Sequence, residues 1–301
     1  MLYKVSETSA EKEQKQNDCL IRAEHLFYSY DDGKSCSLND VSLEIHSGRK
    51  IAFLGANGAG KSTFFLCLNG ILKPTKGQLF FRGTPYSYKQ KDLLKLRQKV
   101  GIVFQNPDDQ LFSASVCQEI SFGLFNLGLT AAEVQTLVNQ IIDYMGLRSC
   151  CHKPVHILSG GQKKQVSIAD ILVMKPELII LDEPVSSLDP KHTDLVNDLI
   201  DQMTLDGMTV LQSTHDVDYA LRWADEVILF HEGCILAHTD PVTLFCNEAL
   251  LTKANLKQPD CLKLFFSLCR KKILSDTLPV PRTLQTLEHY LEQTIERNET
   301  E

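Results

Sequence analysis

Apolar residues along the chain follow two different spacings, and the first is typical of strands. Between 20 and about 45 they alternate in places with polar residues, most clearly at Val41, Leu43 and Ile45, which predicts antiparallel strands with one buried face. The run LIIL at 178–181 is apolar throughout, as in a strand that is buried on both faces. Further strands are expected at 50–54, 78–82, 100–104, 209–212 and 227–230.

The second spacing is typical of helices and is clearest at 130–147. Apolar residues recur there at intervals of three and four, Thr130 and Glu133 have the spacing of a capping box, and Gly146 is suited to end the helix. Strands alternate with helices along the middle of the chain, which predicts an α/β fold with a parallel sheet.

Both ends of the chain differ from the middle. Residues 1–18 are polar and mixed in charge, and we expect a disordered leader there. A main domain is expected at 19–250. At 251–301 an amphipathic segment, PDCLKLFFSLCRKK, and a leucine repeat predict a small C-terminal helical extension. This extension either covers one end of the sheet or takes part in a dimer contact.

Composition limits the classes of protein that need to be considered. The 301 residues carry a net charge of 31 − 38 = −7, which argues against a fold built as a whole for nucleic acid. No uninterrupted apolar run is long enough to span a bilayer, and the first residues resemble neither a signal peptide nor an anchor. We therefore expect a cytoplasmic protein whose membrane contact comes through a partner.

The chain contains ten cysteines, none in a C-x-x-C pair. We expect reduced thiols without a structural disulfide. Cys150 and Cys151, followed by His152, could suggest a metal, but their spacing matches no zinc pattern, so thiols at a helix end and in the core are favoured. Small core residues are expected at Cys67, Cys234 and Cys246.

A glycine-rich loop follows the expected strand at 50–54 and opens a helix at about Lys61. The sequence GANGAGKST matches the phosphate-binding pattern, in which glycines let backbone N–H groups curl toward phosphate oxygens at a helix N-terminus. Lys61 is expected to reach the β- and γ-phosphates, and the Ser62 hydroxyl to ligate Mg²⁺. The expected nucleotide-binding residues of this loop are Gly55, Ala56, Asn57, Gly58, Ala59, Gly60, Lys61, Ser62 and Thr63.

Two carboxylates end the apolar run at 178–181. Asp182 is placed to hold the magnesium, through water, and Glu183 is suited to be the general base for a water that attacks the γ-phosphate. Gln105 follows the strand GIVF, and its amide could sense the magnesium or that water. His215 follows TVLQST and could donate a hydrogen bond to the γ-phosphate.

The motif LSGGQ predicts a second anion site. Ser159 and the next two N–H groups head an expected helix. Because one chain has one triphosphate to bind, this site most economically serves the nucleotide of a neighbouring subunit; the alternative is a plain N-capped helix. The residues expected to act across such a dimer are Ser159, Gly160, Gly161, Gln162 and, just after the carboxylates in SLD (Ser187 to Asp189), Asp189.

Taken together, these motifs resemble those of ABC-type ATPases. The resemblance covers about 20–245 and implies a P-loop NTPase fold with an antiparallel β subdomain and a helical signature subdomain at about 106–172. ATP and Mg²⁺ are the implied ligands, with His215 as the switch histidine. Tyr30 in YSYDDG is implied to stack on adenine, and Tyr28 is its rival for that role.

A closer resemblance is to the ATPase subunits of energy-coupling-factor and cobalt-type importers. The segment VFQNPDDQLFSASVCQEISFG at 103–123 and the tail carry it. It implies import of a vitamin or a transition-metal ion such as cobalt or nickel. The implied partners are a second ATPase subunit, identical or paralogous, a transmembrane coupling protein and a substrate-capturing membrane protein, which place the chain at the cytoplasmic face of the membrane. Asp108 and Asp109 could receive a basic coupling helix, or form a solvated acidic loop.

One position departs from the family pattern. Gln165 stands where the family usually has Arg after LSGGQ, and a contact near the signature or Gln105 is expected to be weaker for want of a bidentate donor. The residues in direct reach of phosphate and metal are kept, so activity is still expected.

The main alternative function is a soluble ABC-family ATPase that acts on nucleic acid or ribosomes. Such proteins usually carry tandem modules, a coiled-coil insertion or basic arms, and the chain has none of these. A P-loop kinase or GTPase is a third class, and it would lack LSGGQ.

Overall fold

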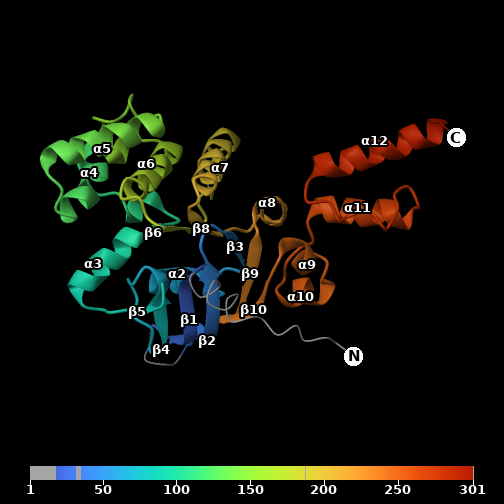
Figure 1. The fold of residues 1–301 in the computed structure, drawn as a ribbon, viewed down its shortest axis with the longest axis horizontal. Helices are drawn as coiled ribbons and strands as arrows, with labels where there is room; N and C mark the ends of the chain where they lie inside the picture. Colours follow the sequence, from blue (N-terminus) through green and yellow to red (C-terminus); the bar gives the residue numbers. More distant parts are fainter. Residues whose placement is uncertain (1–17, 32–34, 187, 301) are drawn as a thin grey trace. The chain divides into compact units, whose positions relative to one another are not determined.

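The computed structural model describes residues 18–31, 35–186 and 188–300, with side chains up to 296. The predicted leader lies, apart from Asp18, outside these residues. The chain forms two compact units, one of Met1–Arg49 with Ser62–Ser213 and the other of Lys50–Lys61 with Thr214–Glu301. Figure 1 labels their helices and strands.

An antiparallel sheet forms one part of the first unit. Its strands, in the spatial order β2-β1-β4-β5, are β2 (Leu38–His46), β1 (Cys19–Tyr28), β4 (Lys76–Phe81) and β5 (Thr84–Pro85). Ile21 lies opposite Ile45 on one side and Phe81 on the other. Along β2, Val41, Leu43 and Ile45 are buried while the residues between them are exposed, so the predicted alternation is confirmed.

Parallel strands form another part of the first unit. The central strand β7 (Leu178–Leu181) pairs with β6 (Val100–Val103) and with β8 (Thr209–Ser213). Every residue of these strands is buried, as the continuous apolar run of β7 predicts for that strand. Their carboxyl ends lie at one edge, where the residues that follow them come together.

The helices of the first unit include the predicted capped helix. Thr130 and Glu133 form the capping box at the start of α5, and Gly146 follows that helix with φ +66°. Apolar side chains of α4, α5 and α6 are buried together, including Ile120, Val138 and Ile168. The helices are α2 (Lys61–Leu68, which begins at the end of the other unit), α3 (Gln90–Lys99), α4 (Val116–Asn126), α5 (Ala131–Tyr144), α6 (Gly160–Leu172) and α7 (Pro190–Leu205), with short 3-10 helices η1 (Pro107–Asp109) and η2 (Val155–Ile157).

The second unit has a smaller strand group. β3 (Lys50–Leu54) runs parallel to β9 (Glu226–His231), and β10 (Cys234–Thr239) pairs antiparallel with β9. Its helices are α8 (Val217–Trp223), α9 (Pro241–Phe245), α10 (Glu248–Lys253), α11 (Asp260–Arg270) and α12 (Leu284–Thr300).

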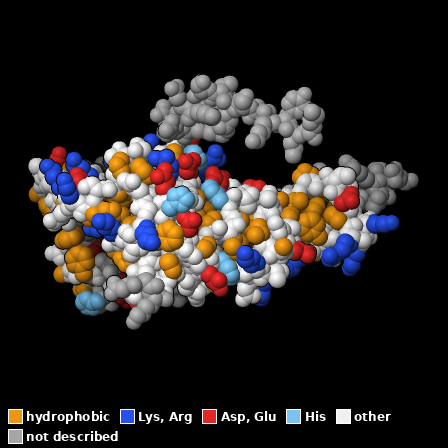
Figure 2. All heavy atoms as spheres, turned by 90° about the horizontal axis from the view of Figure 1, so that it is seen from below, with side chains coloured by type: hydrophobic (Ala, Val, Ile, Leu, Met, Phe, Trp, Pro, Cys, Tyr) orange, Lys and Arg blue, Asp and Glu red, His pale blue; other side chains and the backbone are white. Residues whose placement is uncertain are grey.

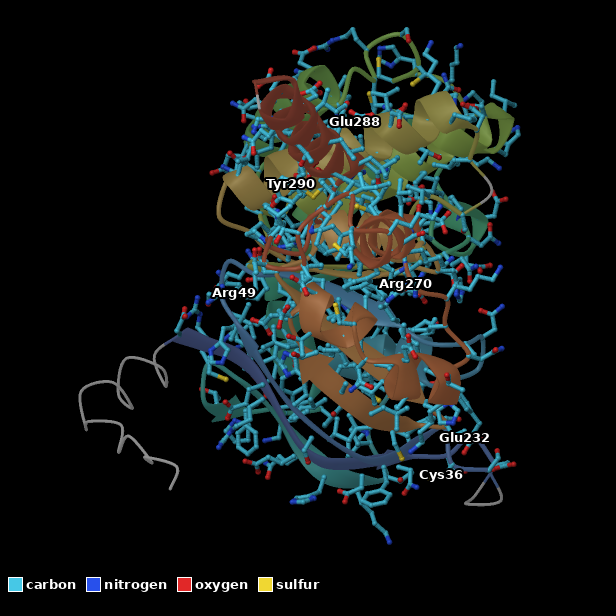
Figure 3. The ribbon with its side chains drawn as sticks, turned by 90° about the vertical axis from the view of Figure 1, so that its right-hand side faces the viewer. Cys36, Arg49, Glu232, Arg270, Glu288 and Tyr290 are labelled. Carbon is cyan, nitrogen blue, oxygen red and sulfur yellow. The ribbon has the colours of Figure 1, made fainter. Side chains whose placement is uncertain are left out.

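A separate apolar cluster joins the last two helices. Phe265, Leu274 and Leu287 are buried in it, as the amphipathic pattern of the tail predicts. Figure 3 labels Arg270 at the end of α11 and Tyr290 on α12, which packs against this cluster.

The C-terminal segment is also fastened to α8 at two places. The Asp218 carboxylate accepts hydrogen bonds from the backbone N–H groups of Asp260, at 2.9 Å, and Cys261, at 3.5 Å. The Arg282 guanidinium donates to the carbonyls of Leu221, at 2.8 Å, and Ala224. A carboxylate thus caps the start of α11, and a cation satisfies the end of α8.

Charged side chains of both signs are interspersed on the face drawn in Figure 2, as expected for a modest net charge. In the part of the chain that the structure describes, no helix combines the length and the apolar character that crossing a membrane needs.

Candidate functional site

The glycine loop has a backbone that only glycine can adopt at its first position. Gly55 follows β3 with φ +140°, and a Cβ atom there would lie 2.3 Å from the carbonyl oxygen of Phe230. Gly58 and Gly60 also have positive φ, +78° and +107°. The N–H of Ala59 donates to the carbonyl of Ala56 at 3.1 Å, so the loop curls into a tight turn before α2, as phosphate binding requires.

The lysine of this loop is buried at the start of α2. Lys61 is 5% exposed, and its Nζ donates to the carbonyls of Gly55 at 2.7 Å and Ala56 at 3.0 Å. Ser62 is exposed at the first turn of the helix, and Thr63 is buried. The expected helix start at Lys61 is confirmed.

Two carboxylates follow β7, and a serine joins them. The Ser213 hydroxyl, at the end of β8, donates to Asp182 Oδ1 at 2.6 Å and accepts from the N–H of Glu183 at 2.8 Å. The N–H of Asp182 donates to the Val103 carbonyl at 3.0 Å. The ends of β6, β7 and β8 are therefore linked by hydrogen bonds, and Ser213 is a contributor that sequence analysis did not single out.

Glu183, the predicted general base, and Gln105, predicted to sense the magnesium or the attacking water, lie in direct contact. The Gln105 amide Nε2 donates to Glu183 Oε2 at 2.7 Å. Glu183 has φ +42°, a left-handed backbone that is uncommon for a residue with a side chain and costs free energy. The turn after β7 thus holds the Glu183 carboxylate beside the segment that follows β6.

A buried lysine holds the backbone around Gln105. Lys164 of α6 is 1% exposed, and its Nζ donates to the carbonyls of Phe104 at 2.8 Å and Gln105 at 2.7 Å. Burial lowers the pKa of Lys164 to about 8, against the raising effect of Asp182 and Glu183. The sequence alone does not predict this role of Lys164, because a contact across 59 residues leaves no local pattern.

The signature motif forms a complete capping box at the start of α6. The Ser159 hydroxyl accepts from the N–H of Gln162 at 3.3 Å, and the N–H of Ser159 donates to Gln162 Oε1 at 3.2 Å. Gly160 has open space around the position of a Cβ. The motif therefore stabilises its own helix while its first turn stays accessible.

A histidine connects the signature with Asp189. A Cβ on Gly161 would lie 2.2 Å from Cδ2 of His192, and His192 Nδ1 lies 2.6 Å from Asp189 Oδ2. Asp189 caps α7 through the N–H of His192, and these hydrogen bonds lower the pKa of Asp189. Ser187 lies outside the described residues.

The tyrosine expected at the adenine is open to solvent. Tyr30 is 61% exposed, and its hydroxyl lies 3.3 Å from Thr63 Oγ1 in α2. Its ring meets that of the half-buried Tyr28 edge to face at 4.9 Å. Of the two rivals, Tyr30 thus has the more accessible ring face.

The remaining candidates are an acidic pair and a histidine. Asp108 forms an ion pair with Lys163 at 2.6 Å, while Asp109 lies beside it in η1. His215 is exposed between β8 and α8. The glycine loop up to Lys61 and His215 belong to the second unit, whereas the other candidate residues belong to the first.

Comparisons with known proteins agree with these motifs. Residues 38–186 match the ABC transporter family. An energy-coupling factor transporter ATP-binding protein, EcfA, of Methanocaldococcus jannaschii is 41% identical over 261 residues, which are 87% of this chain and 92% of that protein. A Methanosarcina mazei protein that carries the name of an ABC transporter ATP-binding protein is 44% identical over 252 residues, but these span 84% of this chain and only 55% of that protein.

A solved structure supports the same assignment. The cbiO1 protein of Clostridium perfringens, described as part of the ABC transporter complex cbiONQ, superposes with a TM-score of 0.70 at 39% identity, over 84% of this chain and 99% of that one. The expected fold, an ABC-type P-loop NTPase with an antiparallel and a parallel sheet, is confirmed. The chain therefore belongs to the ABC transporter ATPases and, among them, to the energy-coupling factor transporter ATP-binding proteins.

Proposed function

We propose that the chain hydrolyses ATP and thereby powers an importer of the energy-coupling-factor type, for a transition-metal ion such as cobalt or nickel or for a vitamin. The observation that carries the proposal is the hydrogen bond between Gln105 and Glu183 at the ends of buried parallel strands. A carboxylate held by an amide there is suited to orient and deprotonate an attacking water.

The residues fit a nucleotide with magnesium. The curled loop at 55–60 offers backbone N–H groups, and Lys61 offers a buried ammonium, to phosphate oxygens. Ser62, Gln105 and Asp182 offer the oxygen ligands that Mg²⁺ prefers. The bound ion would neutralise phosphate charge during the reaction. The exposed ring of Tyr30 would stack on adenine.

The chain's own residues would then orient the attacking water and accept its proton. Glu183 accepts the proton from the water while Gln105 orients both groups, and Ser213 donates a hydrogen bond to Asp182. His215 donates a hydrogen bond to the γ-phosphate. Ser159 to Gln162 and Asp189 complete the site of a second ATPase subunit, identical or paralogous, when the dimer closes around ATP.

The same proposal puts the chain at the cytoplasmic face of a membrane, bound to a transmembrane coupling protein and a substrate-capturing membrane protein. Its relatives are named for such transporters. The alternative of a soluble ABC ATPase that acts on nucleic acid or ribosomes is not favoured by these relatives. Copurification of membrane partners with the full-length chain, followed by mass measurement of the complex and identification of its cargo, tests this location.

Glu183→Gln tests the catalytic part of the proposal. The variant should bind ATP as the wild type does and lose hydrolysis by roughly 100-fold or more, because the amide cannot accept the proton. Nucleotide titration and phosphate release measure the two effects, with excess chelator as the magnesium-free control. Near-normal phosphate release by Glu183→Gln would remove Glu183 from the role of base.

A further inference from the structure

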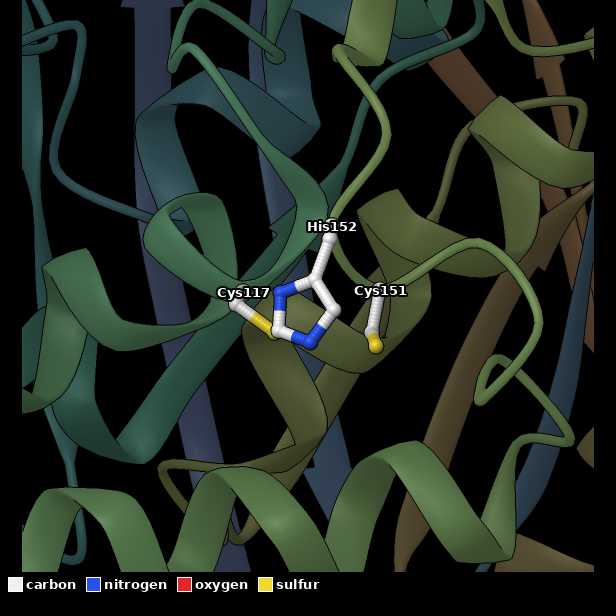
Figure 4. Close-up of side chains that lie close together, drawn as sticks. All are labelled: Cys117, Cys151 and His152. Atoms are coloured by element: carbon white, nitrogen blue, oxygen red, sulfur yellow. The ribbon is translucent and has the colours of Figure 1, made fainter.

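Two thiols and an imidazole converge in the first unit, and none of the three belongs to the candidate nucleotide site. Cys117 lies in the first turn of α4, and Cys151 and His152 lie in the turn after α5. Their Sγ and ring-nitrogen atoms all lie within 4.8 Å of one another. Figure 4 shows the three side chains converging.

Backbone hydrogen bonds hold the two segments together. The N–H of Cys117 donates to the Cys151 carbonyl at 2.9 Å, and the N–H of Val116 donates to the Lys153 carbonyl at 3.2 Å. The backbone therefore holds the segments that carry the three ligand side chains close together. Cys151 is buried, Cys117 is half-buried and His152 is exposed, so the cluster is rigid at its base and open to solvent at its rim.

This set of donors has the chemistry of a zinc site. Zinc binds thiolates at about 2.3 Å and imidazole nitrogen at about 2.0–2.1 Å, so two sulfurs on one ion lie at most about 4.6 Å apart. Small rotations of the side chains would bring the two sulfurs within that limit and the ring nitrogen within about 4.4 Å of each sulfur. We propose that Cys117, Cys151 and His152 bind one thiophilic divalent cation, Zn²⁺ in the first instance, with water in the fourth position.

The neighbouring groups do not compete strongly for the thiols. The Cys151 thiol donates to the Arg148 carbonyl at 3.2 Å, a weak bond that metal binding would replace, with release of the proton. Arg148 itself is engaged by both carboxylate oxygens of Asp143. Cys150 points to its own turn, where its thiol donates to the Leu147 carbonyl at 3.3 Å, and it is not one of the three ligands.

The position of the cluster gives the ion a structural consequence. The segment from 151 to 158 leads into Ser159, and α4 follows the loop that begins at Gln105. A bound ion would join the start of α4 to the segment before the signature. This inference concerns only the first unit, and it stands whether or not the chain powers an importer.

The test uses cobalt as a spectroscopic probe on the full-length, reduced chain without oxygen. Binding of one Co²⁺ per chain should produce thiolate-to-cobalt charge-transfer absorption, and Zn²⁺ should abolish it by displacement. Cys117→Ser and Cys151→Ser should lower the Zn²⁺ affinity by at least about 100-fold, and His152→Ala by at least about 10-fold, since even changes beyond the ligands cost about 10- to 100-fold.

Two cysteine variants serve as matched controls. Cys150→Ser changes the adjacent thiol, and Cys36→Ser changes an exposed one; both should keep the absorption and the affinity. Because His152 is exposed, His152→Ala keeps the test valid if either ligand cysteine proves necessary for folding.

Three results would overturn the inference. The first is the absence of thiolate-to-cobalt absorption with Co²⁺. The second is absorption that persists unchanged in His152→Ala and Cys117→Ser. The third is a Cys117–Cys151 disulfide in chain purified without reductant, together with failure of the same chain to bind metal after the disulfide is reduced.

Discussion

At the scale of single residues, Lys164 is the buried cation on which the position of Gln105 depends. Its ammonium donates to two consecutive carbonyls, those of Phe104 and Gln105, and burial of so polar a group is stable only with such partners. The lowered pKa of Lys164 reflects the cost of that burial.

We expect Lys164→Met to reduce the free energy of unfolding by about 1–3 kcal/mol, because it leaves buried carbonyls without their donor, and to slow ATP hydrolysis by releasing Gln105. Lys163→Met is the matched control. It loses an ion pair with an Asp108 side chain that is 63% exposed, which is worth at most about 1 kcal/mol. Denaturant unfolding and phosphate release measure both variants; equal effects at the two positions would contradict the assignment.

Asp170 of α6 is a second ionisable residue of this helix, and it is half-buried. Burial raises the pKa of Asp170 from 3.8 to about 7, with Glu119 acting in the same direction and the Gln110 amide against it. A raised pKa means that the folded chain binds the proton more tightly than the unfolded chain does. The associated stability is complete below about pH 4 and is lost as the pH rises through about 7.

The advantage of Asp170→Asn over the wild type in free energy of unfolding should therefore grow by roughly 2–4 kcal/mol between pH 5 and pH 8. The amide can still accept from Gln110 and carries no charge. Unfolding curves at the two pH values measure the difference. Asp201→Asn, on the exposed face of α7, is the control and should change neither value; a parallel pH dependence of wild type and Asp170→Asn would refute the argument.

At the scale of elements, α6 connects several parts of the first unit. Its start carries the signature, Lys164 reaches the segment after β6, and its last turns pack on β6 itself. A Cβ on Gly101 of β6 would lie 2.2 Å from Cγ2 of Ile171. The close approach of helix and strand thus depends on a glycine in the strand.

Gly101→Ala should reduce the free energy of unfolding by about 1–3 kcal/mol through overpacking. Ile171→Ala removes the atom that the new methyl group would meet, so the double variant should be less destabilised than the sum of the single variants. Denaturant unfolding of all four chains completes the cycle. Additive losses would show that the new methyl group does not interact with Ile171, and would contradict the argument.

The elements also show what the sequence could predict. Local patterns predicted two elements correctly: an apolar run predicted β7, and a capping pair predicted the start of α5. Sequence analysis did not identify α4, in which polar and aromatic residues interrupt the apolar spacing. Cys246, predicted as a core residue from its apolar surroundings, is exposed at the end of α9, so that prediction is wrong.

The order of the motifs along the chain was enough to predict the site residues. It did not predict which of these residues contact one another. Gln105 and Glu183 are 78 residues apart in the chain yet hydrogen-bonded. Cys117 joins Cys151 and His152 only through the packing of α4, which is why a search by spacing rejected a metal. The division of the chain into a main domain at 19–250 and a C-terminal accessory helical segment at 251–301 stays a prediction.

At the scale of the whole molecule, the proposed dimer can be tested by complementation. Ser159→Asp keeps an N-cap, because aspartate caps helices well, but places a negative charge where a γ-phosphate is expected. Lys61→Ala impairs the phosphate loop of the same chain. Each variant alone should lose hydrolysis, yet their mixture should regain it, because one chain's intact loop meets the other's intact signature.

Phosphate release by the mixture, compared with each variant at the same total concentration, measures this effect. The wild-type rate per chain should also fall on dilution. A mixture as inactive as its components, or a wild-type rate that does not respond to dilution, would show that the signature does not act between subunits.

The fastening of the C-terminal segment to α8 has a consequence for engineering the chain. A chain truncated shortly before Asp260 would lack α11, α12 and Arg282. The carbonyls of Leu221 and Ala224 would lose the hydrogen bonds that Arg282 donates, and Asp218 would lose the backbone N–H group of Asp260. Those losses fall on the short helix that begins two residues after His215. Trimming the tail would thus disturb the neighbourhood of His215, the predicted switch histidine, and shortened chains are a poor substitute for the 301-residue chain.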